Sequence, residues 1–317
     1  MKKLLYSLLL LGMSLGMAAQ EMVVTEEIPP VAPEPTEQDL INAEIFDRVY
    51  EGAKSLAHAP MPVLMTEIAQ QFIGTPYVAH TLEEKPEELR VFLDKTDCIL
   101  FVELCSSFAL TVKGLRIVQA GEGKYWLNET PSVEKDTPSL ALLCHNIQNM
   151  RYRGGKVDGY ASRIHYTSEW ILQNQTNGLM QEYSGDLGEK YEQKFFFMTS
   201  HPQQYDALQD PEQLAAIREV EQNLNEQEPY AFISNERLQD PEVMAQIQSG
   251  DIVCFMSKQG KGIDIAHVAI AFVVGEEMHF IHASYSAEEV KIEETPLAEY
   301  ATNGIRIVRW NEELNNY

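Results

Sequence analysis

The spacing of hydrophobic positions predicts three helices in the first third of the chain. The third of these segments, residues 98–112, is apolar almost all round, which is typical of a helix buried at the centre of a domain. Asp97 precedes it as a helix-start residue, and Gly114 follows it as a stop signal. The two earlier helices are expected over residues 40–57 and 62–72, because their hydrophobic residues recur on one face.

The hydrophobic pattern changes after Gly250. Short runs of hydrophobic and β-branched residues, separated by turn residues, then predict an antiparallel sheet. Before the predicted sheet in the sequence, Asp-Pro-Glu at residues 210–212 and 240–242 predicts two helix starts. Residues 120–205 show no clear hydrophobic period. Helices followed by an antiparallel sheet define the α+β class. The strands are expected at residues 252–256, 263–274, 278–283, 290–292 and 305–310.

The first 38 residues are predicted to lie outside the folded domain. A basic start, an apolar run and the small residues before position 20 are typical of a secretory signal peptide over residues 1–19. Residues 20–38 are rich in proline and glutamate, which indicates a linker. We therefore expect an exported protein, periplasmic or secreted, with a single catalytic domain at residues 39–317. No cysteine follows the apolar run, so a lipid anchor is not expected.

Charge and cysteine content narrow the possible partners and cross-links. The 317 residues carry a formal net charge of -24, which excludes nucleic acid and anionic membrane surfaces as favoured partners. Cys98 and Cys105 lie on one predicted helix, about 10 Å apart, which is too far for a disulfide. Cys105 and Cys254 are expected to be buried thiols, and a bridge from Cys144 remains open. We expect a monomer.

A cysteine and two histidines form the candidate chemistry. Cys98 stands at the start of the central helix, where a helix N-terminus lowers the pKa of a thiol. A thiol nucleophile also needs a base, which a third group holds in place. His267 and His282 lie on adjacent predicted strands. Each of these residues alone is more often structural, but the order helix cysteine, strand histidine, next-strand histidine favours a cysteine hydrolase. We assign Cys98 as nucleophile and His267 as base.

The loop between the two histidine strands decides which residue orients His267. An even loop near Gly275-Glu276, as in the commonest hairpins, places His282 on the face of His267. His282 is then within directly opposite or diagonal reach, and His279 lies on the other face. An odd loop would favour His279. We take His282 as the orienting residue and keep His279 as the alternative.

These segments resemble the NlpC/P60 superfamily of papain-like cell-wall cysteine amidases. The resemblance implies a papain-like core, in which a buried helix carrying the cysteine packs on an antiparallel sheet carrying the histidines. It also implies that the Tyr77 hydroxyl lines the oxyanion site, and that no metal or cofactor takes part. The segments that carry it are Gly74-Thr75-Pro76-Tyr77, Thr96-Asp97-Cys98 with Phe101-Val102-Glu103, Gly250-Asp251-Ile252-Val253-Cys254-Phe255, His267-Val268-Ala269-Ile270 and Phe280-Ile281-His282-Ala283-Ser284.

One branch of that superfamily, DUF1460, is more similar still, and the resemblance runs from about residue 45 to 310. Three positions depart from its pattern: Ile99-Leu100 replace a small hydroxyl residue, Ala269 replaces a glycine, and His80 stands where glycine is common. None of these changes removes a catalytic group. The pieces typical of the branch are residues 74–83, 97–103, 159–170 and 264–267.

Members of this branch are similar to N-acetylmuramoyl-L-alanine amidases. The resemblance implies cleavage between the lactyl group of muramic acid and the first L-Ala of the stem peptide, with a muropeptide or peptidoglycan fragment as substrate. A γ-D-glutamyl-diaminopimelate endopeptidase with the same catalytic residues and a non-catalytic cell-wall binding module remain as alternatives. A zinc hydrolase is disfavoured, because the histidines lack HExxH-type spacing.

Residues 159–170 are the best candidates for substrate recognition, together with Thr81. The guanidinium of Arg163 is suited to hold a stem-peptide carboxylate, or it forms a structural ion pair. The aromatic residues of this segment either stack on sugar and line the cleft or belong to the core. The substrate-binding candidates are Thr81, Tyr160, Arg163, His165, Tyr166 and Trp170.

Overall fold

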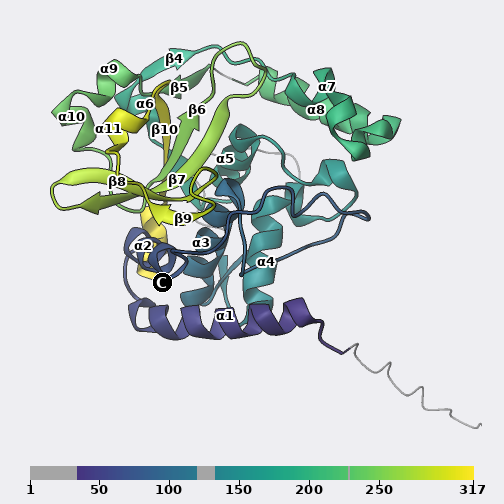
Figure 1. Ribbon diagram of the computed structural model, residues 1–317, viewed down its shortest axis with the longest axis vertical. Helices are drawn as coiled ribbons and strands as arrows, with labels where there is room; N and C mark the ends of the chain where they lie inside the picture. Colours follow the sequence, from purple (N-terminus) through teal and green to yellow (C-terminus); the bar gives the residue numbers. More distant parts are fainter. Residues whose placement is uncertain (1–33, 120–132, 228) are drawn as a thin grey trace, which may run out of the picture. The chain divides into compact units, whose positions relative to one another are not determined.

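A six-stranded antiparallel sheet carries the fold. The computed structural model describes residues 34–119, 133–227 and 229–317, and residues Thr36–Tyr317 form one unit. The sheet has the order β3-β10-β6-β7-β8-β9, with every neighbouring pair antiparallel (Figure 1). Its strands are β3 Met180–Glu182, β6 Ile252–Met256, β7 Ile265–Val274, β8 Glu277–Ser284, β9 Glu289–Ile292 and β10 Ile305–Trp310. Two small sheets pair β1 Leu115–Ile117 with β2 Val133–Lys135, and β4 Glu189–Tyr191 with β5 Tyr230–Phe232.

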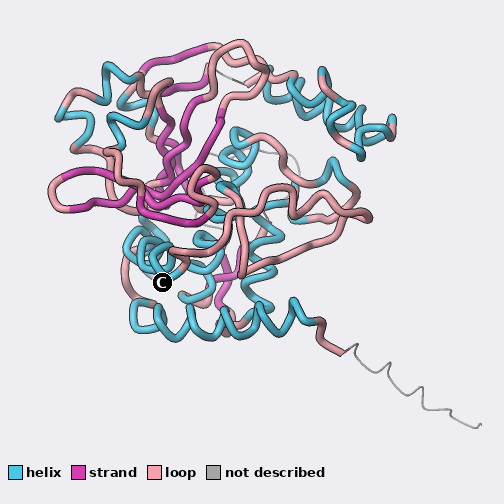
Figure 2. Tube along the Cα trace, in the orientation of Figure 1, coloured by secondary structure: helices cyan, strands magenta, loops and turns pink. Residues whose placement is uncertain are grey.

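Helices surround this sheet, and Figure 2 shows how they and the strands alternate with loops. The longer ones are α1 Glu37–Ala53, α2 Met61–Gln71, α3 Cys98–Val112, α4 Leu140–Arg151, α5 Thr167–Thr176 and α8 Pro211–Asn225. The single-turn helices are α6 Ser184–Leu187, α7 Phe197–Ser200, α9 Asn235–Leu238, α10 Pro241–Met244 and α11 Leu297–Tyr300. Further 3-10 turns occupy Lys54–Leu56, Arg153–Gly155, Tyr160–Ser162, Pro202–Gln204, Asp206–Gln209 and Glu312–Asn316.

Helix α3 is the central element, as its all-round hydrophobicity predicts. The Asp97 side chain caps it by accepting a hydrogen bond of 3.0 Å from the Leu100 N–H. From Phe101 to Val112 every residue is buried. The helix packs between α2 and α4 and lies against β7 and β8. The mixed helix and antiparallel-sheet architecture confirms the α+β class.

The sheet is buried on both faces. Its central strands are hydrophobic at successive positions, and successive side chains point to opposite faces. Val268 and Ile270 face the main core, which the long helices share. Ala269 and Ala271 point the other way, into a smaller core that includes residues of α9, α10 and α11. In Figure 1 these single-turn helices lie on the opposite side of the strands from α2, α3 and α4. A polar side chain on a strand of this sheet is therefore shielded from water by the elements that cover the two faces.

Several boundaries differ from the pattern-based expectation. Helix α1 begins at Glu37, because Thr36 caps it in a reciprocal capping box with Asp39, and it ends at Ala53. The predicted helix start at Asp240 yields only the single turn α10. The predicted signal peptide, residues 1–19, lies outside the described residues, as does most of the predicted linker.

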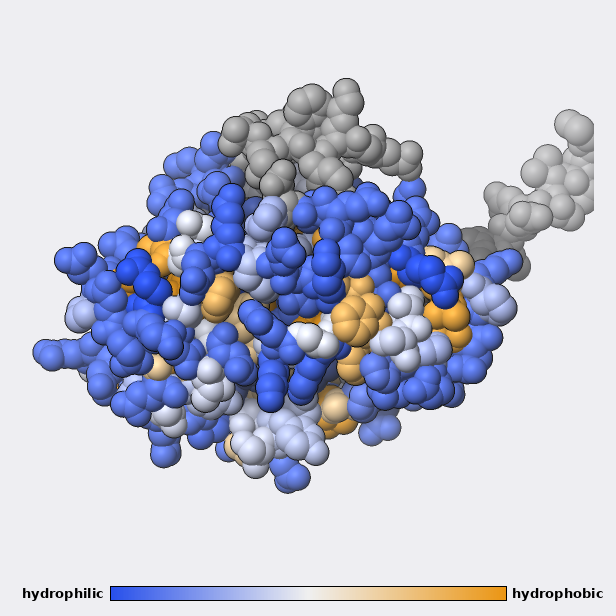
Figure 3. Space-filling view, turned by 90° about the horizontal axis from the view of Figure 1, so that it is seen from above, coloured by the Kyte–Doolittle hydropathy of each residue, from blue (hydrophilic) through white to orange (hydrophobic). Residues whose placement is uncertain are grey.

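The four cysteines are all free, which confirms that Cys98 and Cys105 are not bonded and answers the open question about Cys144. Cys105 and Cys254 are fully buried, as expected. Among the described residues no helix is long and apolar enough to cross a membrane. Hydrophilic residues predominate on the face shown in Figure 3, in keeping with the net charge of -24.

Candidate active site

A hydrogen bond joins two histidines on neighbouring strands. The Nε2 atom of His267 on β7 lies 2.7 Å from the Nδ1 atom of His282 on β8. The connecting loop is Gly275-Glu276, because Val274 pairs with Glu277. This even loop confirms the parity prediction, so His282 shares the face of His267. His279 pairs with Phe272 and lies on the opposite face.

Both histidines are neutral at physiological pH. Burial lowers the pKa of His267 to about 3, and the neighbouring His282 lowers it further. Burial also lowers the pKa of His282 to about 4, against the opposing effect of Glu293. A neutral imidazole has one donor and one acceptor nitrogen. Since Nε2 of His267 faces His282, its Nδ1 is the nitrogen left to accept a proton from a nucleophile.

Cys98 lies at the first position of α3, against the strand that carries His267. Its thiol lies beside the backbone of Val268, the residue after His267, and it is half-buried. Burial and the charge of Asp97 raise the thiol pKa to about 12, although backbone N–H groups at Val268 and Ile99 act in the opposite direction. The expected lowering of this pKa by the helix N-terminus is therefore wrong, because desolvation of the buried thiol outweighs the effect of the helix start.

Tyr77 stands beside the start of α3. It forms an isolated bridge with Thr96, and its backbone N–H donates a 2.8 Å hydrogen bond to the Glu288 carbonyl. Burial and the neighbouring Cys98 and Asp97 raise the pKa of its hydroxyl to about 12. The hydroxyl therefore stays protonated and remains a hydrogen-bond donor. Its ring packs edge-on against Tyr285, whose side chain is exposed.

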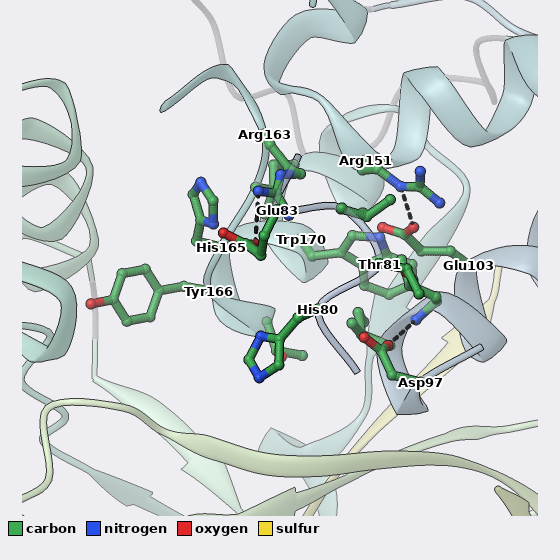
Figure 4. Close-up of a pocket in the computed structure, with 15 residues that line it drawn as sticks. His80, Thr81, Glu83, Asp97, Glu103, Arg151, Arg163, His165, Tyr166 and Trp170 are labelled. Atoms are coloured by element: carbon green, nitrogen blue, oxygen red, sulfur yellow. Dashed lines mark hydrogen bonds and ion pairs between the residues drawn. The ribbon is translucent and has the colours of Figure 1, made fainter. Parts of the chain in front are cut away.

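A cavity of about 170 Å³ opens next to the start of α3 (Figure 4). One wall is the first turn of α3, with Asp97 and Ile99, and Arg163 lies opposite. Five of the six predicted substrate-binding residues line it; these are Thr81, Arg163, His165, Tyr166 and Trp170. The sixth, Tyr160, lines a larger neighbouring cavity of about 740 Å³, which shares His80 and Glu83 with the first.

Most of these predicted binding residues have structural partners. Arg163 is buried and lies 3.0 Å from Glu83 and 3.2 Å from Glu87, which supports the ion-pair alternative. Tyr166 and Trp170 are only 1% and 2% exposed, so their rings belong to the core.

The remaining three candidates differ in how their polar atoms are satisfied. His165 stacks on the Tyr160 ring and contacts the Tyr160 carbonyl at 3.0 Å. The Thr81 hydroxyl is buried without a hydrogen-bond partner among the described residues. The indole Nε1 of Trp170 also lacks a partner among the described residues, so Thr81 and Trp170 both keep a polar atom for a ligand.

Sequence reasoning missed one residue of this site. Glu293 follows β9, and its Oε2 atom lies 3.3 Å from the Nε2 atom of His282. The parity rule that selects His282 also selects Glu293, once the length of the turn between β8 and β9 is known. His282 pairs with Lys291 across β8 and β9, so Glu293 is the diagonal neighbour on that face. Finding it required the length of the 285–288 turn, which the turn sequence did not reveal.

Comparison with known proteins gives the family. The family model described as AmiA-like, N-acetylmuramoyl-L-alanine amidase-like, matches residues 67–305. The chain belongs to this AmiA-like family. The matched range contains Tyr77, Cys98 and both histidines of the 2.7 Å pair. Among curated proteins, none matches this AmiA-like chain.

Solved structures similar to the AmiA-like chain include two from Bacteroides uniformis ATCC 8492 described as N-acetylmuramoyl-L-alanine amidase. One is 30% identical with a TM-score of 0.66, and the match covers 78% of this chain and 98% of that one. The other, at 1.07 Å resolution, is 28% identical with a TM-score of 0.65 and coverages of 83% and 99%. A Legionella pneumophila structure assigned to DUF1460 shares the fold at 18% identity, with a TM-score of 0.58 and coverages of 86% and 97%.

The described residues of this AmiA-like chain hold no group of three or more histidine, cysteine, aspartate or glutamate side chains that could bind a metal ion. Cys98 opens α3 with Tyr77 beside it, and its thiol lies against the backbone of β7, the strand that carries His267. A thiol, an imidazole and a phenol are side chains of the types that act as nucleophile, base and oxyanion donor.

The neutral state of His267 makes the stability of the AmiA-like chain depend on pH. Its folded pKa of about 3 lies below the unfolded value near 6.5, so below pH 6.5 the unfolded chain binds a proton that the folded chain does not. The stabilisation is complete above pH 6.5 and is lost as the pH falls toward 3. We expect the free energy of unfolding in urea to fall from pH 7 to pH 5 in both proteins, and the fall to be about 2 kcal/mol smaller in His267→Gln than in wild type. Equal losses in the two proteins would contradict the buried neutral state.

Proposed function

We propose that this chain is an N-acetylmuramoyl-L-alanine amidase that hydrolyses muropeptides or peptidoglycan fragments through Cys98, His267 and His282. Membership of the AmiA-like family supports a cell-wall amidase, as do the Bacteroides uniformis structures of that description. The observation that carries the mechanism is the 2.7 Å bond between His282 on β8 and His267 on β7, the strand against which the Cys98 thiol lies.

Acylation begins with both reacting groups neutral. The Cys98 thiol has a pKa of about 12 and His267 one of about 3, so a thiolate–imidazolium pair is strongly disfavoured at rest. The thiol proton therefore moves to Nδ1 of His267 while the sulfur attacks the lactyl carbonyl carbon. His282 holds the imidazole at the Nε2 atom of His267, which leaves Nδ1 of His267 as the nitrogen that takes the proton.

The negative charge that develops on the lactyl oxygen needs donors. The Tyr77 hydroxyl and the backbone N–H groups at the start of α3 supply them. Each such donor contributes on the order of 2.7–4 kcal/mol to transition-state stabilisation. The raised pKa of Tyr77 suits this role, because the phenol keeps its proton at any pH near neutrality.

Collapse of the tetrahedral intermediate breaks the C–N bond. His267 gives its proton to the nitrogen of the departing L-Ala, and a thioester remains on Cys98. A water molecule then attacks the thioester carbonyl while His267 accepts its proton, and the proton returns to sulfur when the C–S bond breaks. The products are a stem peptide with a free amino group and a muramic acid with a free lactyl carboxylate.

Substrate recognition is proposed to extend from Cys98 into the cavity beside α3. The Thr81 hydroxyl lines that cavity and has no partner among the described residues, so it is available to a stem-peptide amide. Arg163 shapes the wall from within its ion pairs with Glu83 and Glu87.

Two broader assignments belong to the same proposal. The packing of α3 against β7 and β8 supports a papain-like NlpC/P60 core. Residues 1–19 are proposed to direct export to the periplasm or the cell exterior, which is where cell-wall fragments are available.

The decisive experiment identifies the products by mass. We expect the purified protein to convert a muramyl tetrapeptide into intact tetrapeptide and free muramic acid sugar. Sugar that retains L-Ala-D-Glu would instead make the protein a γ-D-glutamyl-diaminopimelate endopeptidase. Binding without any product would make it a non-catalytic cell-wall binding module.

A further inference from the structure

Three polar side chains lie in a diagonal row across one edge of the sheet, on or next to the neighbouring strands β7, β8 and β9. His267 on β7 bonds to His282 on β8, and His282 faces Glu293 just beyond β9. His282 pairs directly with Lys291, so Glu293, two residues further along, is its diagonal neighbour. The β8–β9 turn has four residues, which again preserves the shared face.

The protonation states of the two histidines can be assigned in turn, beginning from Glu293. His282 Nε2 is buried and has no well-aligned hydrogen-bond partner among the described residues, yet Glu293 Oε2 lies 3.3 Å away. A carboxylate only accepts hydrogen bonds, so this nitrogen carries the proton. The Nδ1 atom of His282 is then an acceptor, and His267 must donate from Nε2. His267 Nδ1 is left unprotonated, which is the state that a base requires.

Glu293 is held firmly in this position. Its Oε1 atom accepts a 3.1 Å hydrogen bond from the Thr295 N–H, and its Oε2 atom lies 3.5 Å from the Lys291 Nζ atom. Its backbone N–H donates to the Phe280 carbonyl at 2.9 Å. From the other face of the sheet, His279 Nδ1 lies 3.0 Å from the Glu293 carbonyl. Oε1 is therefore engaged by the Thr295 backbone, and Oε2 is the oxygen that faces His282 and Lys291.

We propose that Glu293 is a positioning residue that sets the tautomers and orientation of both histidines, so that Nδ1 of His267 is unprotonated and able to accept the proton of Cys98. The inference rests on the proposed function of Cys98 and His267. The carboxylate receives no proton during the reaction. The proton stays on His267 until the leaving amine takes it, and Glu293 only orients the two rings.

The amide variant Glu293→Gln gives an unusual expectation. Thr295 N–H requires an acceptor, so the glutamine oxygen stays there and its NH₂ group turns toward His282. A donor at that position favours the opposite tautomer of His282, and in turn of His267, whose Nδ1 then carries a proton. An isosteric change therefore harms the reaction more than the truncation Glu293→Ala, which imposes no tautomer.

We expect Glu293→Gln to lower kcat by about 10²–10³-fold with little change in KM. This is less than the roughly 10⁴-fold loss on amidating a residue that directly orients a catalytic imidazole. Glu293→Ala should lose less and Glu293→Asp least. Glu294→Gln makes the same change of charge at the exposed neighbouring residue and should match wild type. A purely structural role predicts the reverse order, with glutamine milder than alanine, and that order would overturn the inference.

A second readout separates this inference from the proposed function. The rate at which iodoacetamide alkylates Cys98 is measured from pH 5 to pH 10, which requires no substrate. We expect slower alkylation and a profile shifted to higher pH for Glu293→Gln, but not for Glu294→Gln. If wild type cleaves no muropeptide while this difference persists, the proposed function fails and the inference holds. If wild type cleaves and the two variants agree with it within twofold in both assays, Glu293 has no positioning role.

Discussion

The Cys98→Ala variant is expected to lose muropeptide hydrolysis by on the order of 10⁴–10⁶-fold. In the proposed mechanism no other described group replaces the thiol, because His267 is assigned as base and Tyr77 as a protonated donor. The residual rate would come from oxyanion stabilisation and binding alone. Peptide release is followed by chromatography, with enzyme in large excess so that slow turnover remains measurable. Binding of the substrate should persist, because alanine removes only one atom beyond Cβ.

The matched control for this variant is Cys144→Ala. Cys144 is a second free, half-buried thiol, on helix α4, and its pKa is also raised by burial. The charged groups that act on it are Arg151 and Asp39, neither of which has a role in the proposed mechanism, so Cys144→Ala should keep wild-type kcat/KM. Equal activity of Cys98→Ala and wild type would eliminate the thiol mechanism. Loss of activity in both variants would point to a general sensitivity of the fold.

Burial favours a neutral resting state for the two reacting groups of the proposed mechanism. The thiol and the imidazole lie against a sheet that is covered on both faces, so charge on either one is costly. The pair cannot ionise in advance, and the proton must move as the C–S bond forms. A bound substrate changes this balance, because the oxyanion donors compensate charge only once it develops on the carbonyl oxygen.

Local patterns predicted much of the fold and the two histidines. The bounds of α3 and β6 could be found because each is a continuous apolar run between clear stop signals. The choice of His282 over His279 followed from strand periodicity and the common two-residue hairpin. Both inferences depend on neighbouring residues alone, which a sequence reports directly.

Features that depend on distant contacts were not predictable in this way. The raised pKa of Cys98 arises mainly from burial of the thiol in the folded chain, which the residues around Cys98 in the sequence do not report. The partners of Arg163, Glu83 and Glu87, come from 80 and 76 residues earlier. Helix α4 escaped detection because its buried face includes the polar residue Asn146, which satisfies the backbone of β1 at Leu115 and Ile117.

The Arg306→Met variant is expected to lower the free energy of unfolding by about 3–5 kcal/mol, because it leaves buried carboxylates without their partner. Arg306 is 1% exposed on β10 and binds both oxygens of Glu182, at 2.7 and 2.8 Å. Its Nη1 atom lies 2.8 Å from Asp264, which also accepts a hydrogen bond from Ser168. The group thus ties β10 and α5 to the segment that leads into the His267 strand.

The pH dependence of this loss distinguishes an unpaired charge from a simple packing defect. Burial already raises the pKa of Asp264 while Arg306 lowers it, so removing the guanidinium raises it further. The folded variant then binds a proton more readily than the unfolded chain, and its stability falls as the pH rises through the folded pKa. The deficit relative to wild type should therefore be smaller at pH 5 than at pH 8 in urea unfolding. Adding Asp264→Asn should recover part of it, whereas a deficit independent of pH would indicate packing alone.

The exposed ion pair at Arg116 provides the matched control. Arg116 contacts Glu134 and lies 3.7 Å from Asp136, with its side chain 40% exposed. Solvent screens such pairs, so Arg116→Met should cost less than about 1 kcal/mol. Because the two substitutions are chemically identical, the difference between their effects isolates the contribution of burial. A loss of similar size at both positions would mean that the Arg306 group is no more important to the fold than a surface ion pair.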